Sequence, residues 1–284
     1  MTFLEYYVQI LLFTAAVPLA FGLAVYFCNK TFCALVGTGW GRPILLGLHA
    51  FLTPIREFAH LVAAMITFHR IGDFCLLNLH DPEGELGFVE HSYNRRNPIA
   101  VFGNFLFAIL PAALGLALSL VVVLVCFRGA FSVFSTEVAA LIEAEAGFGE
   151  YARLALGFLP AIFRDATTSL LAKAVGTVLL LLLSLGVYVS VDDLMGGLGG
   201  LLHYAVFVFF FAGVTALFDA RARRLILTDF RTFATSVTAL FTVVLVFALA
   251  ALALGAVILV LRTLLGDGAR GLVVYEDNRY NYRR

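Results

Sequence analysis

Long uncharged apolar runs alternate with shorter polar segments along the chain, and the runs have the length of membrane-spanning helices. About 20 apolar residues, rising about 1.5 Å each, cross the hydrocarbon core of a bilayer. Four runs reach that length without a charged side chain: residues 6–29, 97–127, 194–218 and 232–261. We therefore predict a transmembrane helix in each of them.

Two further apolar runs are interrupted by charge. Residues 169–191 contain Lys173 as their sole charged residue, and its long side chain can reach the headgroups from within a span. Residues 43–68 contain Arg56 and Glu57 at their middle. With both runs counted, the chain is expected to be an all-α polytopic membrane protein of about six transmembrane helices. It would form a single integral membrane domain over its whole length, 1–284.

Six crossings would place the polar segments on alternate sides of the membrane. Residues 70–97 and the polar tail, 263–284, would share one side, and residues 128–168 and 219–231 would share the other. The arginines of residues 219–231 form the densest short basic loop of the chain. The positive-inside rule therefore favours the cytoplasm for that side.

The polar segments predict small elements rather than a soluble domain. Residues 70–97 hold two extended stretches around an Asp-Pro-x-Gly turn, so we predict a β-hairpin inserted between the second and third spans. Residues 128–168 place glutamates among Ala and Leu, a pattern typical of an amphipathic connecting segment of short helices. The tail is expected to be a loose terminus.

The composition agrees with a membrane location and argues against a soluble domain and against a nucleic-acid-binding protein. The chain is 62% hydrophobic and 13% charged, whereas roughly a quarter of the residues in a soluble domain are charged. Its 19 basic and 19 acidic residues cancel, so nucleic acid is not an expected partner. The four cysteines include no C-x-x-C pair, so neither a zinc ribbon nor a disulfide framework is predicted.

The interrupted run carries the candidate chemistry. On a helix, Arg56 and His60 at i and i+4 share one face, and Glu57 lies beside His60 at i, i+3. Such side chains are costly in lipid, at roughly 2.5 to 3.5 kcal/mol for an Arg at mid-helix, so they must face the protein interior. One interpretation is an ion pair of Arg56 with Glu57 or Asp193 that fixes helix packing. The other is a metal site.

The same segment carries a resemblance to a known family. Arg56-Glu57-Phe58-Ala59-His60 resembles the H-E-x-x-H helix of the M50 (site-2 protease-like) membrane metallopeptidases, in a degenerate form. Residues 85–98 and 102–115 are similar to the hairpin and following helix of bacterial members. The resemblance covers residues 53–115 and implies a multi-pass protein of the bacterial inner (plasma) membrane.

The resemblance also implies a set of site residues. His60 would be a zinc ligand, and Glu57 would be the general base that activates the metal-bound water. In the family an aspartate from a later helix completes the ligands, and Asp193, or its neighbour Asp192, resembles that position. Two further polar residues are candidates to support these groups: Asn104 and His203.

Arg56 stands where the family has its first histidine ligand. A guanidinium has no lone pair for a metal, and its charge would repel Zn²⁺ in a site of low dielectric constant. We therefore expect a catalytically impaired, pseudoprotease-like scaffold without a bound metal, in which Arg56 replaces the metal electrostatically. Such a chain would act as a binding or structural subunit of a membrane assembly. Its expected partners are membrane lipid, another protein or a second copy of itself, and an extended peptide along the hairpin edge.

Two alternatives stay open. The first is an active intramembrane zinc protease with a rearranged ligand set, for which Zn²⁺ would be the cofactor. His49 could join that set only if Pro54 folds the helix back, because eleven residues of continuous helix separate it from His60 by about 16 Å. The second is a channel or transporter component with a path lined by polar side chains: Arg56, Glu57, Asp193 and His203.

The glycines after Asp193 also have two interpretations. Gly196 and Gly200 form a small-x-x-x-small pair, which permits close approach of two helices. The same residues could instead form a flexible turn.

Overall fold

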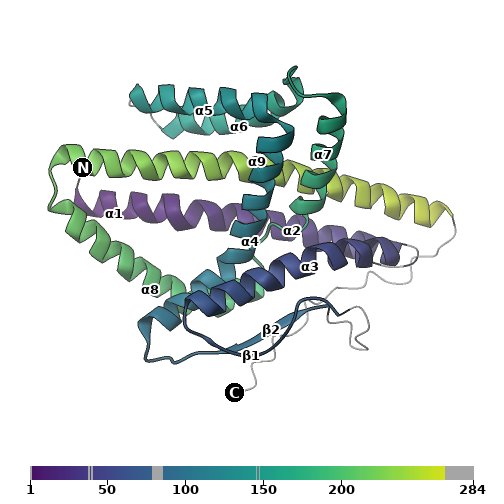
Figure 1. Cartoon of the computed structure of the whole chain (residues 1–284), viewed down its shortest axis with the longest axis horizontal. Coiled ribbons are helices and arrows are strands. Elements are labelled where there is room, and N and C mark those ends of the chain that lie inside the picture. The colour runs from purple at the N-terminus through teal and green to yellow at the C-terminus, as the bar shows by residue number, and fades with distance from the viewer. Residues whose placement is uncertain are drawn as a thin grey trace.

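The computed structural model describes residues 2–37, 39, 41–78, 86–144, 146 and 148–265 and is mostly helical (Figure 1). The helices are α1 (Phe3–Leu11), the short π-helix η1 (Leu12–Ala16), α2 (Val17–Val36), α3 (Gly41–Ile66), α4 (Pro98–Cys126), α5 (Arg128–Glu143), α6 (Phe148–Arg164), α7 (Leu170–Ser184), α8 (Val191–Ala216) and α9 (Ala220–Leu264). The strands are β1 (Arg70–Cys75) and β2 (Phe88–Ser92). The predicted tail lies outside the described residues beyond position 265.

Four stretches of helix are long and apolar enough to cross a membrane. They are the continuous unit α1–η1–α2, and α4, α8 and α9. The 15 residues of α7 are apolar but extend only about 22 Å, less than the roughly 30 Å of a hydrocarbon core. α3 is a helix of 26 residues, but Arg56 and Glu57 lower its hydropathy. Length and composition therefore support a membrane protein with four candidate spans, and the count of six is not confirmed.

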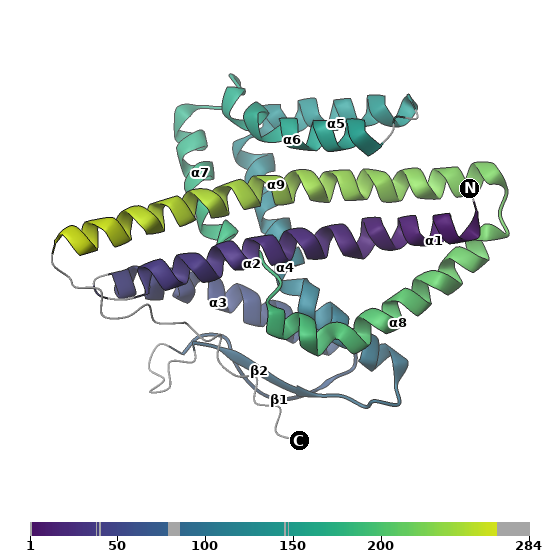
Figure 2. The same ribbon diagram turned by 180° about the vertical axis from the view of Figure 1, so that it is seen from behind.

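The continuous unit α1–η1–α2 and the helix α9 pack side by side and run in the same direction (Figures 1 and 2). The residues that they bring together advance along both sequences: Tyr6 shares a buried cluster with Leu227, Val25 shares one with Val244, and Phe32 lies against Gly255. Arg262, near the end of α9, donates from Nη1 to the carbonyl of Leu35 at the end of α2. α1–α2 and α9 therefore form one parallel pair through the middle of the molecule.

α4 and α8 approach closely through two glycines. A Cβ added at Gly200 would lie 2.5 Å from the backbone nitrogen of Phe105, and one at Gly197 would lie 3.0 Å from the Cβ of Ala108. Gly196 and Gly199 are exposed on the other side of α8. The predicted flexible turn is therefore wrong, because these glycines lie inside a helix. The close approach exists, but Gly197 and Gly200 make it rather than the pair of Gly196 and Gly200.

Within the segment predicted to hold short helices, α5 and α6 fold back on α9 as an arm (Figure 1). A cluster of buried side chains that includes Phe134, Phe158 and Phe247 joins the arm to α9. The carboxylate of Asp165 accepts hydrogen bonds from the hydroxyls of Thr167 and Thr168 and from the amide of Ala130. These bonds hold the Asp165 pKa well below its usual range and tie the end of α6 to the start of α5.

β1 and β2 pair in antiparallel register, as the hairpin prediction requires. Arg70 faces Ser92 and Cys75 faces Phe88, with a bulge between Ile71 and Phe74. The predicted turn between the strands lies outside the described residues. The hairpin packs on α3, because a Cβ at Gly87 would lie 3.0 Å from the Cγ of Glu57.

Candidate functional site

α3 presents the three polar residues of the interrupted run on its inner side. The helix continues through Pro54 without a break, so the i, i+1, i+4 spacing of Arg56, Glu57 and His60 holds. Glu57 and His60 are 2% and 0% exposed. His49 stays three turns away and lies 3.7 Å from the Cys33 sulfur, so the rearrangement that would bring it to His60 does not occur.

α8 brings an aspartate to the same place. Ser190 is the N-cap of α8, and its hydroxyl accepts a hydrogen bond from the backbone N–H of Asp193 at 3.0 Å. This cap sets the rotation of the first turn, so that Asp193 is buried and Asp192 is exposed. Asp193 is therefore the residue that faces α3.

Arg56 and Asp193 form a direct ion pair. Nη2 of Arg56 donates to Oδ2 of Asp193 at 2.9 Å, and the two side chains are 18% and 3% exposed. The guanidinium carbon also lies 5.7 Å from the centre of the Tyr188 ring, within range of a cation–π interaction. The predicted pairing of Arg56 with Asp193 is therefore present in the structure.

His60 lies against this pair and against an aromatic ring. Its Nε2 is 4.0 Å from Oδ1 of Asp193, and its ring stacks on Phe107 of α4 with centroids 4.1 Å apart. Phe107 also contacts His91 of β2, with centroids 4.2 Å apart. The polar cluster is therefore linked through Phe107 to the hairpin.

Two histidines attach the hairpin to the start of α4. Nε2 of His69 is 2.7 Å from the carbonyl of Ala100, which can only accept, so this nitrogen donates its proton. Neutral His69 then has a lone pair on Nδ1, which accepts from the Nδ1–H of His91 at 3.0 Å. Burial, and after it the electrostatic interaction with His69, lowers the His91 pKa to about 4.

The remaining predicted residues divide into two groups. Asn104 is buried on α4, and its backbone carbonyl oxygen lies at the close approach to Gly197 of α8. His203 is exposed, and its ring nitrogen Nδ1 contacts the carbonyl of Gly199 in its own helix at 2.8 Å. Asp192 is exposed as well. Asn104 is thus buried at the contact of α4 with α8, whereas Asp192 and His203 are exposed.

The donor set does not fit a zinc ion. Zinc sites use at least three protein ligands, and among the described residues no group of three His, Cys, Asp or Glu side chains could hold a metal. His60 and Asp193 approach each other, but one oxygen of Asp193 is bound by a guanidinium 2.9 Å away. A cation is therefore already present at the carboxylate that zinc would need.

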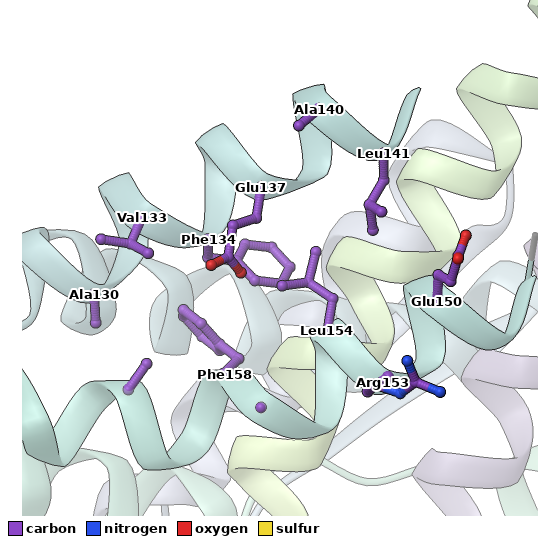
Figure 3. Close-up of a pocket in the computed structure, with 12 residues that line it drawn as sticks. Ala130, Val133, Phe134, Glu137, Ala140, Leu141, Glu150, Arg153, Leu154 and Phe158 are labelled. Carbon is purple, nitrogen blue, oxygen red and sulfur yellow. The ribbon is translucent and has the colours of Figure 1, made fainter. Parts of the chain in front are cut away.

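A hollow lies in the arm, on the other side of α9 from the hairpin (Figures 1 and 3). It is a groove of about 590 Å³ between α5 and α6. Its floor is apolar, with Phe134, Leu154 and Phe158, and charged residues such as Glu137 and Arg153 stand at its rim (Figure 3). It shares no residue with the Arg56 cluster.

Comparison with known proteins finds no matching family model, curated protein or solved structure. The function of the cluster is therefore argued from its geometry.

Sequence reasoning missed three residues that shape the cluster. Tyr188, Ser190 and Phe107 carry no metal-binding or catalytic signal in the sequence. For Ser190 a signal exists, because Ser-x-x-Asp before an apolar run is a helix-start pattern. Tyr188 and Phe107 reach the cluster only through tertiary packing, which no local pattern reports.

Proposed function

We propose that this chain is a non-proteolytic relative of the M50 membrane metallopeptidases that acts as a binding or structural subunit of a membrane assembly. The observation that carries the proposal is the ion pair of the half-buried Arg56 with the buried Asp193, 2.9 Å apart. Arg56 occupies the position of the first histidine of the H-E-x-x-H motif, and Asp193 resembles the aspartate ligand. The pair thus joins the two helices that a zinc ion would join.

The chemistry of the pair supports a structural role. A buried carboxylate and a buried guanidinium are each costly alone and are tolerated together, because each neutralises the other. The Tyr188 ring adds a second attractive contact to the cation. A guanidinium cannot activate water as a Lewis acid does, since it has no site for a ligand.

The hairpin offers a surface for a partner. Each strand of a two-stranded hairpin has one edge that its sister strand does not cover, and an extended peptide can add to such an edge. Gly87, the residue before β2, lies against Glu57, so a peptide there would sit close to the polar cluster. We propose an extended segment of a membrane protein as this partner.

We further propose that the chain is a multi-pass protein of the bacterial inner membrane with an odd number of crossings. The sequence count of six puts four crossings between the first span and the last, which makes those two spans antiparallel. The parallel packing of α1–α2 with α9 requires an odd number between them. Adding α3 to the four candidate helices gives five crossings and meets this requirement.

One observation favours a second candidate, the active zinc protease. Glu57, His60 and Asp193 remain together and buried, so the base and two ligands of the family are retained. This candidate needs a further ligand to replace the missing histidine and needs Arg56 to leave Asp193.

Metal content separates the two candidates. Zinc would be measured per chain by mass spectrometry on the detergent-purified protein and on three variants: Arg56→His, Arg56→His with His60→Ala, and His60→Ala. We expect well under one zinc in the natural chain and about one in Arg56→His, because that variant completes the His-Glu-x-x-His ligand pair beside Asp193. The double variant should lose it again.

Zinc in the natural chain would support the protease instead. About one zinc in the natural chain that disappears in His60→Ala would mean that an unidentified ligand completes a working site. The non-proteolytic proposal would then be withdrawn in favour of the protease, and cleavage of membrane peptides would be assayed with Glu57→Gln as the inactive control.

A further inference from the structure

The turn that links α3 to β1 holds an exposed phenylalanine in a left-handed backbone conformation. Phe68 has a φ of 59°, and in the part of the chain that the structure describes no other residue except a glycine has a positive φ. Its side chain is 70% exposed. A Cβ makes the left-handed region sterically unfavourable, and a bulky residue there is a genuine outlier. The turn therefore carries a conformational cost that a glycine would avoid.

The hydrogen bonds at the end of α3 require this conformation. The amide of His69 donates to the carbonyl of Ala64 at 2.9 Å, and the amide of Phe68 donates to the carbonyl of Met65 at 3.4 Å. These two bonds form a Schellman motif, in which the residue just past the helix is left-handed and is usually glycine. The motif explains the backbone of Phe68 but gives no reason for its aromatic side chain. Strain of this kind is often found where a side chain has a function.

The residues on both sides of Phe68 fix the turn. Thr67 and His69 are buried, and both pack against Gly103 of α4, where an added Cβ would overlap the Thr67 hydroxyl and lie 2.8 Å from Nε2 of His69. The same Nε2 donates to the carbonyl of Ala100. Phe68 is therefore exposed on a turn that is anchored on α4, and its exposure follows from the fold.

More apolar side chains are exposed around this turn. Met65 and Ile66 in the last turn of α3 and Ile99 in the first turn of α4 are each more than half exposed. The end of α3, the start of β1 and the start of α4 meet at one corner of the molecule (Figure 1). Large apolar side chains gathered at an exposed place mark a contact with a membrane or with another protein.

Two arginines lie at the same corner. Arg95 and Arg96 are exposed, follow the end of β2 and directly precede the uncharged run of residues 97–127. The end of β2 is held beside the start of β1, where the rings of His69 and Tyr93 stack with centroids 5.2 Å apart. This end of the hairpin therefore combines exposed apolar and exposed basic side chains.

Charge and position indicate that the contact is with lipid. Arg70, the first residue of β1, adds a third positive charge, and the acidic residues of the strands, Asp73 and Glu90, lie further along the hairpin. An anionic bilayer attracts basic side chains, and aromatic side chains favour the headgroup level. The apolar run 43–68 ends at this corner and the run 97–127 begins there. The corner therefore lies at the border of the apolar region.

We propose that this corner is a membrane anchor. Phe68 inserts at the boundary between headgroups and acyl chains, and Arg95 and Arg96 contact the phosphates of anionic phospholipids around it. Burial of the Phe68 ring in lipid removes apolar area from water, which offsets the strain of the left-handed turn. The anchor requires a membrane location but not the proposed relation to proteases.

Quenching of a tryptophan at position 68 by brominated lipid tests the anchor. The full chain would carry Phe68→Trp, with its single natural tryptophan replaced as Trp40→Phe. It would be reconstituted into phosphatidylcholine vesicles with a minor fraction of brominated phosphatidylglycerol or brominated phosphatidylcholine. Bromine near the headgroup end of the acyl chains should quench more than bromine near their far end, and iodide in the water should quench little. Brominated phosphatidylglycerol should quench at least about twofold more than brominated phosphatidylcholine, because the arginines enrich anionic lipid around the ring.

The arginines are tested in the same assay. Arg95→Gln/Arg96→Gln should remove the preference for phosphatidylglycerol. Arg153→Gln/Arg164→Gln removes two exposed arginines from the arm and should leave the preference unchanged. If the first double variant does not fold, about 1 M salt takes its place, because that concentration screens exposed charges.

Other outcomes overturn the proposal. Strong quenching by iodide without quenching by lipid would place Phe68 in water, at a surface for a protein partner or for none. Strongest quenching by bromine at the far end of the acyl chains would place the ring deep in the bilayer, away from the phosphates. A preference for phosphatidylglycerol that is absent, that survives the loss of Arg95 and Arg96, or that the arm variant abolishes equally would mean that these two arginines do not select the lipid.

Discussion

Arg56 and Asp193 are 137 residues apart in the sequence, and each charge is tolerated in an apolar interior because the other lies beside it. Replacing Arg56 by Met keeps the volume but leaves Asp193 as a buried carboxylate without its cation. We expect Arg56→Met to lower the free energy of unfolding by about 3 to 5 kcal/mol, the usual effect of breaking a buried pair. Denaturant or thermal unfolding in detergent would measure it.

The double variant Arg56→Met/Asp193→Asn is the control for that prediction. Removing both charges should recover most of the lost stability, because neither group then requires a partner. Asp192→Asn is the matched neighbour, with an exposed carboxylate, and should change stability by less than about 0.5 kcal/mol. If Arg56→Met were as neutral as Asp192→Asn, the pair would not hold α3 to α8.

His91 gives a prediction about pH. Its pKa is lowered to about 4 in the folded protein, against about 6.5 for an unperturbed histidine, so the unfolded chain binds the proton first. Stability from the neutral ring is therefore full above pH 6.5 or so and declines as the pH falls toward about 4, by a few kcal/mol at most. Melting temperature against pH measures it. His91→Gln should flatten the profile over that window, and His203→Gln, which removes an exposed histidine, should leave it unchanged.

The sequence predicted the chemistry of these residues better than it predicted which residues they contact. That Arg56 needs an acidic partner follows from the energetics of a charge in lipid, and Glu57 and Asp193 were the two partners predicted for it. Which of Asp192 and Asp193 faces α3 depends on the Ser190 cap, which sets the rotation of the first turn of α8. The contacts of Phe107 with His60 and His91 come from three separate elements, and no spacing in the sequence brings them together.

At the scale of elements, the contact of α4 with α8 gives a matched pair of variants. In Gly200→Ala the new Cβ would meet backbone atoms of α4, Phe105 N at 2.5 Å and Val101 O at 2.8 Å, and backbone cannot yield as a side chain can. We expect a loss of about 1 to 3 kcal/mol from overpacking. At Gly199 nothing lies within 4 Å, so Gly199→Ala should be neutral or stabilise the helix by up to about 1 kcal/mol. Thermal unfolding in detergent compares them, and equal effects would mean that the helices do not touch here.

The elements themselves follow from the pattern of the chain to different degrees. The uncharged runs all became helices, because in an apolar setting the backbone must satisfy its own hydrogen bonds. Residues 169–191 did not form one long helix, since Gly186 follows the end of α7 and an extended stretch leads to Ser190. The rotation of α8 that turns Gly197 rather than Gly196 toward α4 depends on the Ser190 N-cap. A small-x-x-x-small pattern contains no information on that rotation.

At the scale of the molecule, the directions of the helices could not be predicted from the hydropathy of the chain. Counting apolar runs assumes that every run crosses fully and that directions alternate. α7 is too short to cross at full thickness, and α3 carries charges that require protein rather than lipid around them. An uncertain crossing in the middle of the chain reverses every direction after it, so the parallel packing of α1–α2 with α9 could not be deduced from the runs.

That packing makes a prediction about topology in sealed membrane vesicles. On a background in which the four native cysteines are replaced by serine, single cysteines would be introduced as Leu4→Cys, Ala220→Cys and Leu265→Cys, all at exposed positions. A membrane-impermeant maleimide should label positions 4 and 220 from one side and position 265 from the other. Parallel helices that both cross must begin on the same side, whereas alternation over six or four spans puts positions 4 and 220 on opposite sides. Labelling of 4 and 220 from opposite sides would therefore refute the parallel arrangement in the membrane, and labelling of 220 and 265 from one side would mean that α9 does not cross.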